Sequence, residues 1–444
     1  MKKSTVRIIT GIMLAAAAAI IWQVCFRSTG SSSKELSDST KNLAKEYQTQ
    51  GDANQPDFIQ PEVNLSDQSD YDFSKSYMDF SVSMLKKSQE NNENRMISPL
   101  SIMLALTMTG NGARGETLAE MEAVLNGGYA MDVLNQELPG WVSGLPDSEK
   151  GRLCLANAIW VNNKDDSFTP DQGFLEKNGY YYNADIFSSD FGEKTLADIN
   201  NWVEQRTEGM VKDILDKIPE EAVMYLINAV AFEAEWEVTY KGSDVRNGTF
   251  TDAEGTEHTV SMMYSTEQTY MEDASATGFI KPYAEGYLFA AILPNEGISL
   301  EEYMNQLDSE QLLQTIGQAD DTISVTAGLP KHESESSLEL SEALSAMGMP
   351  LAFNDKLADF SGLGRSTNGN IYISRVLHKT YINIDELGTK AAAATVVEAV
   401  AESAMMIDKT VILNRPFLYM ILEEDSMLPI FMGTVHVPGE SDTP

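Results

Sequence analysis

The sequence predicts an α+β fold in which helices pack on large, mixed or mostly antiparallel β-sheets. Helical spacing of apolar residues occurs in the first half of the chain, at 98–109 and 196–211. Segments rich in apolar and β-branched residues dominate later, which is typical of strands. This order argues against an alternating design with a parallel sheet. The strand candidates are 156–161, 223–232, 287–293, 322–329, 379–384, 417–422 and 430–436.

The first 26 residues have the pattern of an export segment. Lys2, Lys3 and Arg7 precede a nearly continuous apolar run at 8–26. Such a run is long enough to be a signal peptide or an uncleaved membrane anchor. We therefore expect a protein that is secreted or held at the cell surface. The Trp-Gln-Val sequence before Cys25 lacks the small residues that precede a lipid-modified cysteine, so lipidation has little support.

A change in composition marks the start of the folded domain. Residues 27–70 are rich in Ser, Asp, Asn, Gln and Lys and contain few large apolar side chains. This composition is typical of a solvated, disordered linker. We expect one domain over 71–444, with no internal repeat.

Charge and residue usage narrow the function classes. The chain has 31 Lys and Arg against 67 Asp and Glu, a net charge of -36. Coulomb repulsion therefore disfavours nucleic acid as a partner, and disfavours an anionic membrane except through the N-terminal segment. Two cysteines, Cys25 and Cys154, cannot build a disulfide framework.

Catalytic, metal and cofactor patterns are missing from the sequence. Four histidines lie far apart, and neither a HExxH motif nor a CxxC pair is present. The chain also lacks a GxSxG elbow, a phosphate-binding Walker loop and a complete GxGxxG pattern. We therefore expect no enzyme activity, no metal and no cofactor.

The most informative segment is 378–417. It begins with strand-like alternation, passes through Gly388 and Thr389, and reaches four consecutive alanines at 391–394. Alanine has the highest helix propensity, so residue statistics alone favour an amphipathic helix here. A run of small and β-branched residues can also slide between existing strands. The surrounding residues decide between the two.

Residues 386–395 read ELGTKAAAAT, which resembles the hinge of the serpin family of serine protease inhibitors. Lys390 stands where many members have glutamate, but it should point to solvent. The residues before Trp236, Glu-Ala-Glu, lack the lysine or glycine often found there. The resemblance runs from about residue 71 to the C-terminus and favours an exported bacterial member. Its further pieces are 97–102, 228–232 with Trp236, 329–331, 353–354, 359–362, 378–379, 414–417 and 431–433.

The resemblance implies a suicide substrate of a serine protease, or of a cysteine protease. An exposed loop from Gly388 to about Leu413 would be attacked, and its hinge side would insert into the central sheet before the acyl-enzyme hydrolyses. We expect a monomer. The implied hinge residues are Glu386, Gly388, Thr389, Ala391, Ala392, Ala393 and Ala394. The implied residues where strands part, the shutter and breach, are Ser98, Ser101, Asn228, His378 and Trp236.

Taken alone, these residues have simpler interpretations. Ser98 and Ser101 suit a helix N-cap, His378 suits a strand, and Trp236 suits an aromatic core. Inhibition is favoured over the alternative, a non-inhibitory serpin that acts as a binding or structural surface module. The reason is that alternate loop residues are small and uncharged, whereas the opposite set contains charges that can stay in water. The small set is Thr389, Ala391, Ala393 and Thr395, and the charges are Lys390 and Glu398.

Two family spacings place the bond that the protease would cut. Counting forward from Glu386 gives Glu402–Ser403, and counting back from 414–417 gives Met405. A trypsin-like target is disfavoured because no arginine lies between Gly388 and Asn414. Glu402 would suit a Glu-preferring protease, whereas small or linear apolar residues nearby would suit an elastase-like or subtilisin-like protease, which we favour. The alternative residues at the cut are Ala401, Ala404, Met405 and Met406.

Overall fold

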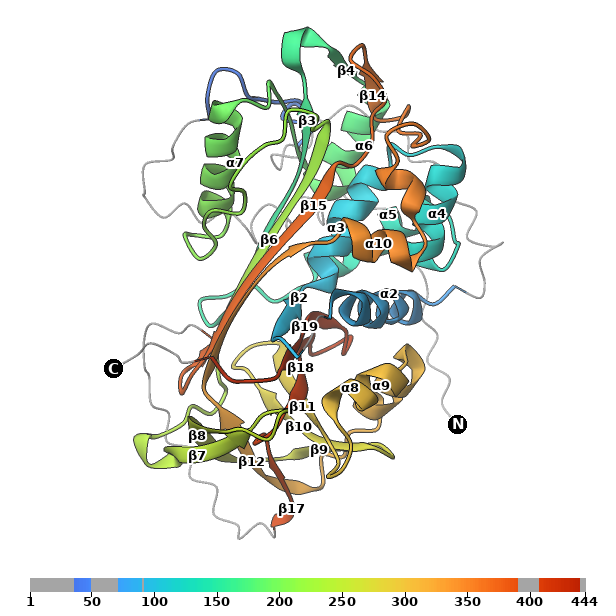
Figure 1. Cartoon of the computed structure of the whole chain (residues 1–444). Coiled ribbons are helices and arrows are strands. Elements are labelled where there is room, and N and C mark those ends of the chain that lie inside the picture. Colours follow the sequence, from blue (N-terminus) through green and yellow to red (C-terminus); the bar gives the residue numbers. More distant parts are fainter. Residues whose placement is uncertain (1–35, 49–70, 90–91, 390–406, 440–444) are drawn as a thin grey trace.

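The structure is a computed structural model that describes residues 36–48, 71–89, 92–389 and 407–439. It confirms the α+β class: within these residues, helices pack on large mixed and antiparallel sheets (Figure 1). The helices are α2 (Phe73–Ser88), α3 (Pro99–Gly110), α4 (Gly115–Asn126), α5 (Met131–Ser143), α6 (Gln172–Tyr182), α7 (Glu193–Arg206), α8 (Leu300–Gln306), α9 (Ser309–Gly317) and α10 (Ser341–Met347).

The central sheet has seven strands in the order β1-β5-β3-β6-β16-β15-β13. Its longest members, β3 and β6, pair antiparallel, whereas β6 and β15 pair parallel. The short strand β16 lies between β6 and β15 at one end only. We call this the hinge end of the sheet. The strands are β1 (Lys41–Asn42), β3 (Gly151–Asn162), β5 (Asp185–Ser189), β6 (Met224–Glu235), β13 (His332–Glu339), β15 (Arg375–Ile384) and β16 (Gly388–Thr389).

Two further large sheets form the other half of the molecule. The six-stranded sheet has the order β2-β19-β18-β11-β10-β9, and the four-stranded sheet has the order β17-β12-β8-β7. Their strands are β2 (Arg95–Ile97), β7 (Val245–Thr251), β8 (Glu257–Glu267), β9 (Thr269–Glu272), β10 (Ala276–Pro282), β11 (Tyr287–Pro294), β12 (Ser324–Pro330), β17 (Ile407–Ile412), β18 (Phe417–Glu423) and β19 (Pro429–Val435). A small pair, β4 (Phe168–Pro170) and β14 (Gly364–Ser366), completes the described strands.

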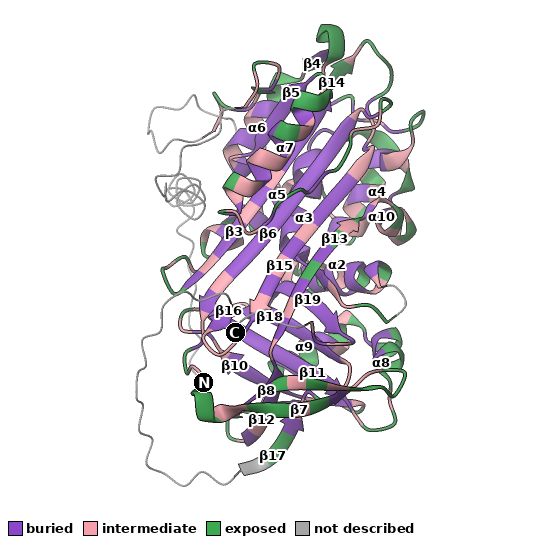
Figure 2. Cartoon of the chain, turned by 60° about the vertical axis from the view of Figure 1, so that its left-hand side comes forward, coloured by how far each residue is buried: buried purple, intermediate pink, exposed green. Residues whose placement is uncertain are grey.

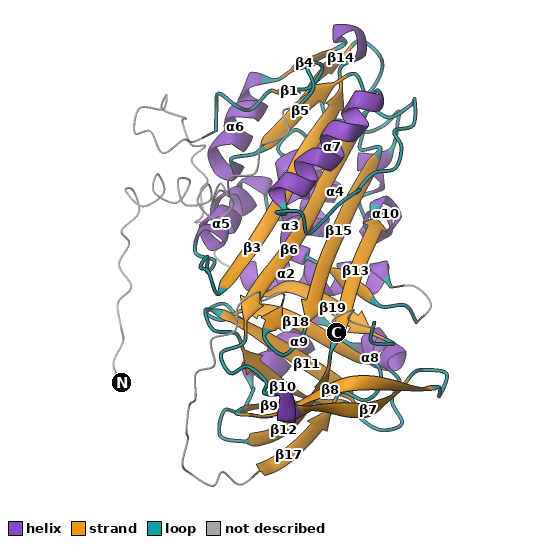
Figure 3. Cartoon of the chain, turned by 90° about the vertical axis from the view of Figure 1, so that its left-hand side faces the viewer, coloured by secondary structure: helices purple, strands orange, loops and turns teal. Residues whose placement is uncertain are grey.

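Apolar side chains cover both faces of the central sheet, so its middle strands are buried (Figure 2). Residues of β6 alternate between the two faces, as a strand requires. Leu226, Val230 and Phe232 join the main core with α3, whereas Tyr225 and Ile227 join a second core under α7. Figure 3 shows α7 lying across β3 and β6 on that second face. A strand that enters beside β6 must therefore suit two packed faces.

The helices and strands predicted from the sequence are present, but several begin or end at different residues. The helix expected at 98–109 is α3, which begins after the N-cap Ser98 and contains only buried residues. The helix expected at 196–211 is α7, which ends at Arg206. It stops there because Glu208 and Gly209 have positive φ. Strands β3 and β15 begin earlier than expected, at Gly151 and Arg375.

The linker expected over 27–70 is wrong for residues 36–48, which pack against the central sheet. Strand β1 pairs with the edge strand β5, and Ala44 is fully buried. Thr40 Oγ1 donates a 2.6 Å hydrogen bond to Asp198 on α7. The polar residues that indicate solvation in the composition are thus partners of buried carboxylates. The expected export segment, 1–26, lies outside the described residues.

No helix in the described part of the chain is long and apolar enough to cross a membrane.

Asp185 is the main anchor of residues 36–48. Its carboxylate accepts hydrogen bonds from Asn42 Nδ2 (2.8 Å), Gln48 Nε2 (2.9 Å) and Trp202 Nε1 (3.1 Å), and it pairs with Arg206. Asp185→Asn should lower the free energy of unfolding by about 2–4 kcal/mol, because Arg206 loses its buried counter-charge. Urea titration followed by circular dichroism measures this. The exposed neighbour Asp38→Asn is the control, and equal losses in the two variants would contradict the assignment.

Candidate functional site

The hinge end of the central sheet is a tight hairpin between β15 and β16. Asp385 follows β15, and its carboxylate accepts hydrogen bonds from Leu387 N (2.8 Å) and Gly388 N (3.3 Å). Asp385 N donates to Gly388 O at 2.9 Å and closes the hairpin. Aspartate favours such turns because its side chain can bond backbone amides two residues on. The chain is therefore reversed just after β15 and directed back into the sheet.

Gly388 is required at the first residue of β16. Its φ of +149° lies in a region that side chains rarely adopt, and an added Cβ would lie 2.0 Å from Ala234 O on β6. Only glycine can therefore bring the backbone this close to β6. This geometry gives a physical reason for the glycine in the hinge motif.

Thr389 is already inserted between β6 and β15. It pairs with Ala234 on one side and with Ile384 on the other, and it is fully buried. Its hydroxyl shares a 2.8 Å hydrogen bond with the hydroxyl of Tyr283. The hinge end of the sheet is thus open by two residues, and direct β6–β15 pairing closes the seam from Arg375 to Tyr381.

Trp236 braces this open end. Its ring stacks on Tyr283 with centroids 4.3 Å apart, and its Nε1 donates to Asp385 O at 2.9 Å. Its backbone N also donates to Leu387 O at 2.9 Å. Trp236 therefore connects the end of β6 with the hairpin that follows β15.

A surface ion pair holds the hinge glutamate. Glu386 Oε1 lies 2.5 Å from the ammonium of Lys331, which follows β12. The Glu386 carbonyl also accepts a hydrogen bond from Tyr240 N at 3.0 Å. These contacts fix Glu386 to the residue after β12 and to the segment that follows β6.

The middle of the central sheet contains a buried polar cluster. Asn228 on β6 lies level with His378 on β15 and with Asn157 on β3. Its amide nitrogen donates to Ser101 Oγ and to Asn157 Oδ1, both at 2.5 Å. Ser101 Oγ in turn donates to Asn157 Oδ1 at 3.0 Å. The cluster thus links three strands to the start of α3.

The cluster fixes the protonation of His378. Its Nε2 accepts a 3.0 Å hydrogen bond from Ser98 N, so the ring proton is on Nδ1, which donates to Asn228 Oδ1. Desolvation by burial lowers the pKa of His378 to about 3. The imidazole is therefore neutral at neutral pH and bonds to partners on both sides.

The sequence singled out most, but not all, of this site. Ser98, Ser101, Asn228 and His378 meet in one cluster, and Trp236 lies at the hinge end with Glu386, Gly388 and Thr389. Sequence reasoning missed Asn157, Tyr283 and Asp385. Asn157 could have been found as an amide inside an otherwise apolar strand. The other hinge and bait residues, Ala391, Ala392, Ala393, Ala394, Ala401, Glu402, Ser403, Ala404, Met405 and Met406, lie outside the described residues.

Among the residues that the structure describes, no group of three His, Cys, Asp or Glu side chains is placed to hold a metal ion. The described cysteine, Cys154, is buried and free.

The buried imidazole predicts a pH dependence of stability. Below the ordinary value of 6.5 the unfolded chain takes up a proton at His378, but the native protein does not until the pH nears about 3. The contribution of His378 to the free energy of unfolding is therefore complete above pH 6.5. It falls by about 1.4 kcal/mol per pH unit as the pH decreases through this window.

His378→Asn should remove that contribution to the slope of unfolding free energy against pH. Ser101→Ala is the matched control, because it removes a hydrogen bond of the same cluster but no titrating group. It should lower stability by about 1 kcal/mol at every pH and leave the slope unchanged. Denaturant titrations between pH 4 and 8 measure both, and an unchanged slope in His378→Asn would contradict the assignment.

Comparisons with known proteins agree with this geometry. The profile of the Serpin (serine protease inhibitor) family matches residues 75–438. An uncharacterised serpin-like protein of Thermococcus kodakarensis is 32% identical over 373 residues, which cover 81% of this chain and 84% of that protein. The leukocyte elastase inhibitor of Xenopus tropicalis is 30% identical over 379 residues, which cover 81% and 97%.

The fold matches a solved structure over nearly its whole length. The native state of Tengpin, a thermophilic serpin, has a TM-score of 0.82 and 44% sequence identity, and the match covers 90% of this chain and 100% of that chain. The hinge, the polar cluster and these matches lead to one conclusion: the chain belongs to the serpin family.

Proposed function

We propose that this chain inhibits an elastase-like or subtilisin-like serine protease by trapping it as an acyl-enzyme. The observation that carries the proposal is that the hinge already lies between β6 and β15. A loop that starts inside the sheet can continue into it once the protease has cut its far side. This favours the inhibitor over a serpin that only offers a binding or structural surface.

The strand register supports insertion without a shift of the sheet. Tyr381 on β15 lies level with Ala231 on β6, which brings Ile384 level with Ala234 three residues further on. Thr389 pairs with both Ile384 and Ala234. A loop that continues from Thr389 can therefore pair with β6 and β15 while these keep their relative position. One parallel pairing would be replaced by two antiparallel ones, which are slightly more stable per residue.

Extending this register beyond Thr389 predicts which residues of β6 and β15 each loop residue would pair with. Thr395 would lie between Asn228 and His378, where its hydroxyl could join the polar cluster. Because side chains alternate, Ala391 and Ala393 would share the main-core face with Thr389 and Thr395. That face of β6 carries Phe232 and Val230 and is closely packed, so small residues suit it.

The opposite face suits the two charges of the loop. Lys390 would lie beside Glu233, whose side chain is partly exposed and already pairs with Arg152. Glu398 would lie level with Tyr225, which is fully buried in the second core, and with Arg375, which begins β15 and would supply the counter-charge. Each charge would thus meet a residue of opposite or polar character, and neither would enter the main core.

The covalent step belongs to the protease. Its serine hydroxyl attacks the carbonyl carbon of the residue before the cut, here Glu402, and the peptide bond to Ser403 breaks. The new amine of Ser403 takes the proton that the serine gave to the protease's base. The ester that remains is the trapped species. The inhibitor therefore needs no catalytic residue of its own.

The start of β17 supports a cut before Ile407, after Glu402 or a close neighbour. Strand β17 begins at Ile407 and pairs with β12. Ala401 and Ala404 are the small alternatives, and Met405 is the linear apolar one. The similarity to leukocyte elastase inhibitor of Xenopus tropicalis supports an elastase-like target. The apolar segment at 8–26 supports a protein that acts outside the cell or at its surface. We propose that it acts as a monomer.

Mixing the protein with elastase, subtilisin and a Glu-specific protease tests the proposal. We expect a complex that survives boiling in detergent, and mass spectrometry should find a released peptide that begins at Ser403 or a neighbour. Complete cleavage in the loop with the proteases still active would show a substrate or a non-inhibitory serpin, and would overturn the proposal.

Two variants test the insertion step with elastase. Ala391→Glu places a charge on the main-core face and should slow insertion, so the stable complex should fall at least about tenfold while loop cleavage continues. Lys390→Glu introduces the same residue on the opposite face and is the matched control, which should keep most of the complex. Equal complex yields from both variants would contradict the proposed register.

A further inference from the structure

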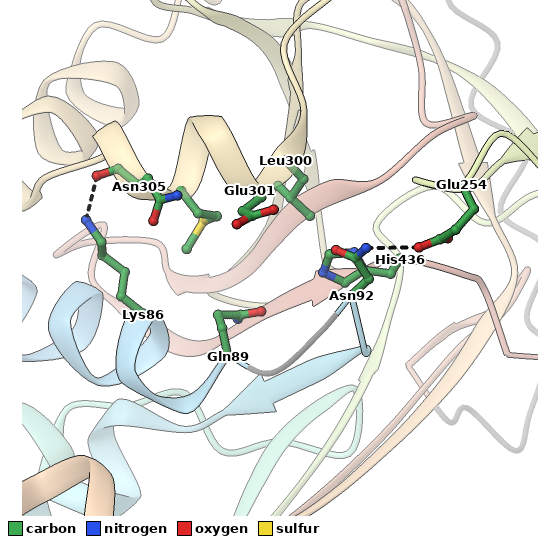
Figure 4. Close-up of a pocket in the computed structure, with 9 residues that line it drawn as sticks. Lys86, Gln89, Asn92, Glu254, Leu300, Glu301, Asn305 and His436 are labelled. Atoms are coloured by element: carbon green, nitrogen blue, oxygen red, sulfur yellow. Dashed lines mark hydrogen bonds between the residues drawn. The ribbon is translucent and has the colours of Figure 1, made fainter.

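A pocket lies away from the hinge and the polar cluster, between the end of α2, helix α8 and the residues that follow β19 (Figure 4). It encloses about 510 Å³, which is within the usual range for small-molecule sites. The lining residues are Lys86, Gln89, Asn92, Glu254, Leu300, Glu301, Met304, Asn305 and His436. The proposed inhibitory mechanism uses none of them.

Two buried polar atoms that line this pocket have no hydrogen-bond partner among the described residues. His436 is only 7% exposed, and its Nδ1 is unpaired. Gln89 Oε1 accepts from Thr434 Oγ1 at 3.1 Å, which leaves its Nε2 unpaired. Buried polar atoms are nearly always satisfied in native proteins. The pocket therefore offers bonds that a bound molecule could complete.

The two ends of the pocket differ in charge. Glu254 and Glu301 lie on the side of His436, and both act to raise the pKa of that imidazole, although desolvation lowers it overall. Glu254 accepts a 3.0 Å hydrogen bond from Asn92, which holds it over the pocket. At the other end Lys86 donates to the carbonyls of Asn305 (3.1 Å) and Leu307 (3.0 Å). An ammonium has three donors, so one remains.

Apolar side chains form part of the pocket wall. Leu300 is 4% exposed and Met304 is 6% exposed, and both line the pocket from α8. A molecule that crosses the pocket should therefore carry a short aliphatic chain. Its cation would meet Glu254, Glu301 and the unpaired nitrogen of His436, and its carboxylate would meet Gln89 Nε2 and Lys86.

We propose that this pocket binds a small aliphatic zwitterion of the basic amino-acid class, with its cation beside Glu301 and its carboxylate beside Gln89. The site is independent of protease inhibition, so the two proposals can fail separately.

Calorimetry with three probes tests the site on the intact protein. L-arginine has both charged ends, L-citrulline lacks the side-chain cation, and agmatine lacks the carboxylate. We expect saturable binding of L-arginine, with citrulline and agmatine each weaker by about tenfold or more. No saturable binding of L-arginine, or equal binding of all three probes, would overturn the proposal.

Two variants test where L-arginine binds. Glu301→Gln should weaken L-arginine binding by about tenfold, because it removes a carboxylate from the cation end. Glu310→Gln is the matched control, since it makes the same change on the exposed surface of α9, outside the pocket. Equal affinities in the two variants would show that L-arginine binds elsewhere and would overturn the assignment. Unfolding midpoints of both variants confirm that they are folded.

Discussion

The parallel pairing of β6 with β15 is the constraint on which the rest of the structure depends. These two strands are neighbours through most of their length, yet they separate at the hinge end, where Thr389 lies between them. A parallel pair needs a long crossover connection, so no tight turn ties the two strands together. Backbone hydrogen bonds and packed side chains hold the seam, and both can be exchanged for those of an inserted strand.

The polar cluster explains how a buried seam can be both closed and separable. Asn228 and His378 bond to each other across the seam. Ser98, the N-cap of α3, bonds to His378, and Ser101 in the first turn of α3 bonds to Asn228. An apolar contact at this level would be lost without replacement when the strands part. Amide, imidazole and hydroxyl groups can instead bond to a polar residue of an entering strand, and Thr395 is the residue that the register supplies. Neutral His378 suits this exchange, because a charged imidazole at this depth would need a fixed counter-charge.

Much of this site could be predicted because the hinge is local in sequence. Gly388 and Thr389 sit within a short motif whose geometry follows from glycine and from alternation. Asn157 and Tyr283 were missed because their roles depend on strands that are distant in sequence. Residues 36–48 were assigned wrongly because composition shows only that a residue is polar. It does not show whether the folded chain places a buried carboxylate, such as Asp185 or Asp198, within hydrogen-bond distance of that residue. Partners of this kind are fixed only by the three-dimensional arrangement.

The charged features of the molecule divide into two regions. Lys331 and Glu386 fix the hinge, whereas Glu254, Glu301 and Lys86 surround the pocket at the end of α2. The first region bears on the loop insertion that we propose. The second lies between the end of α2, helix α8, the turn between β7 and β8, and the residue after β19.

A crystal structure of the protein after one cut within 390–406 tests loop insertion most directly. We predict that β6 and β15 are then separated along their length, with the loop paired antiparallel to both and Thr395 level with Asn228 and His378. A cleaved protein in which β6 and β15 still pair directly would contradict it.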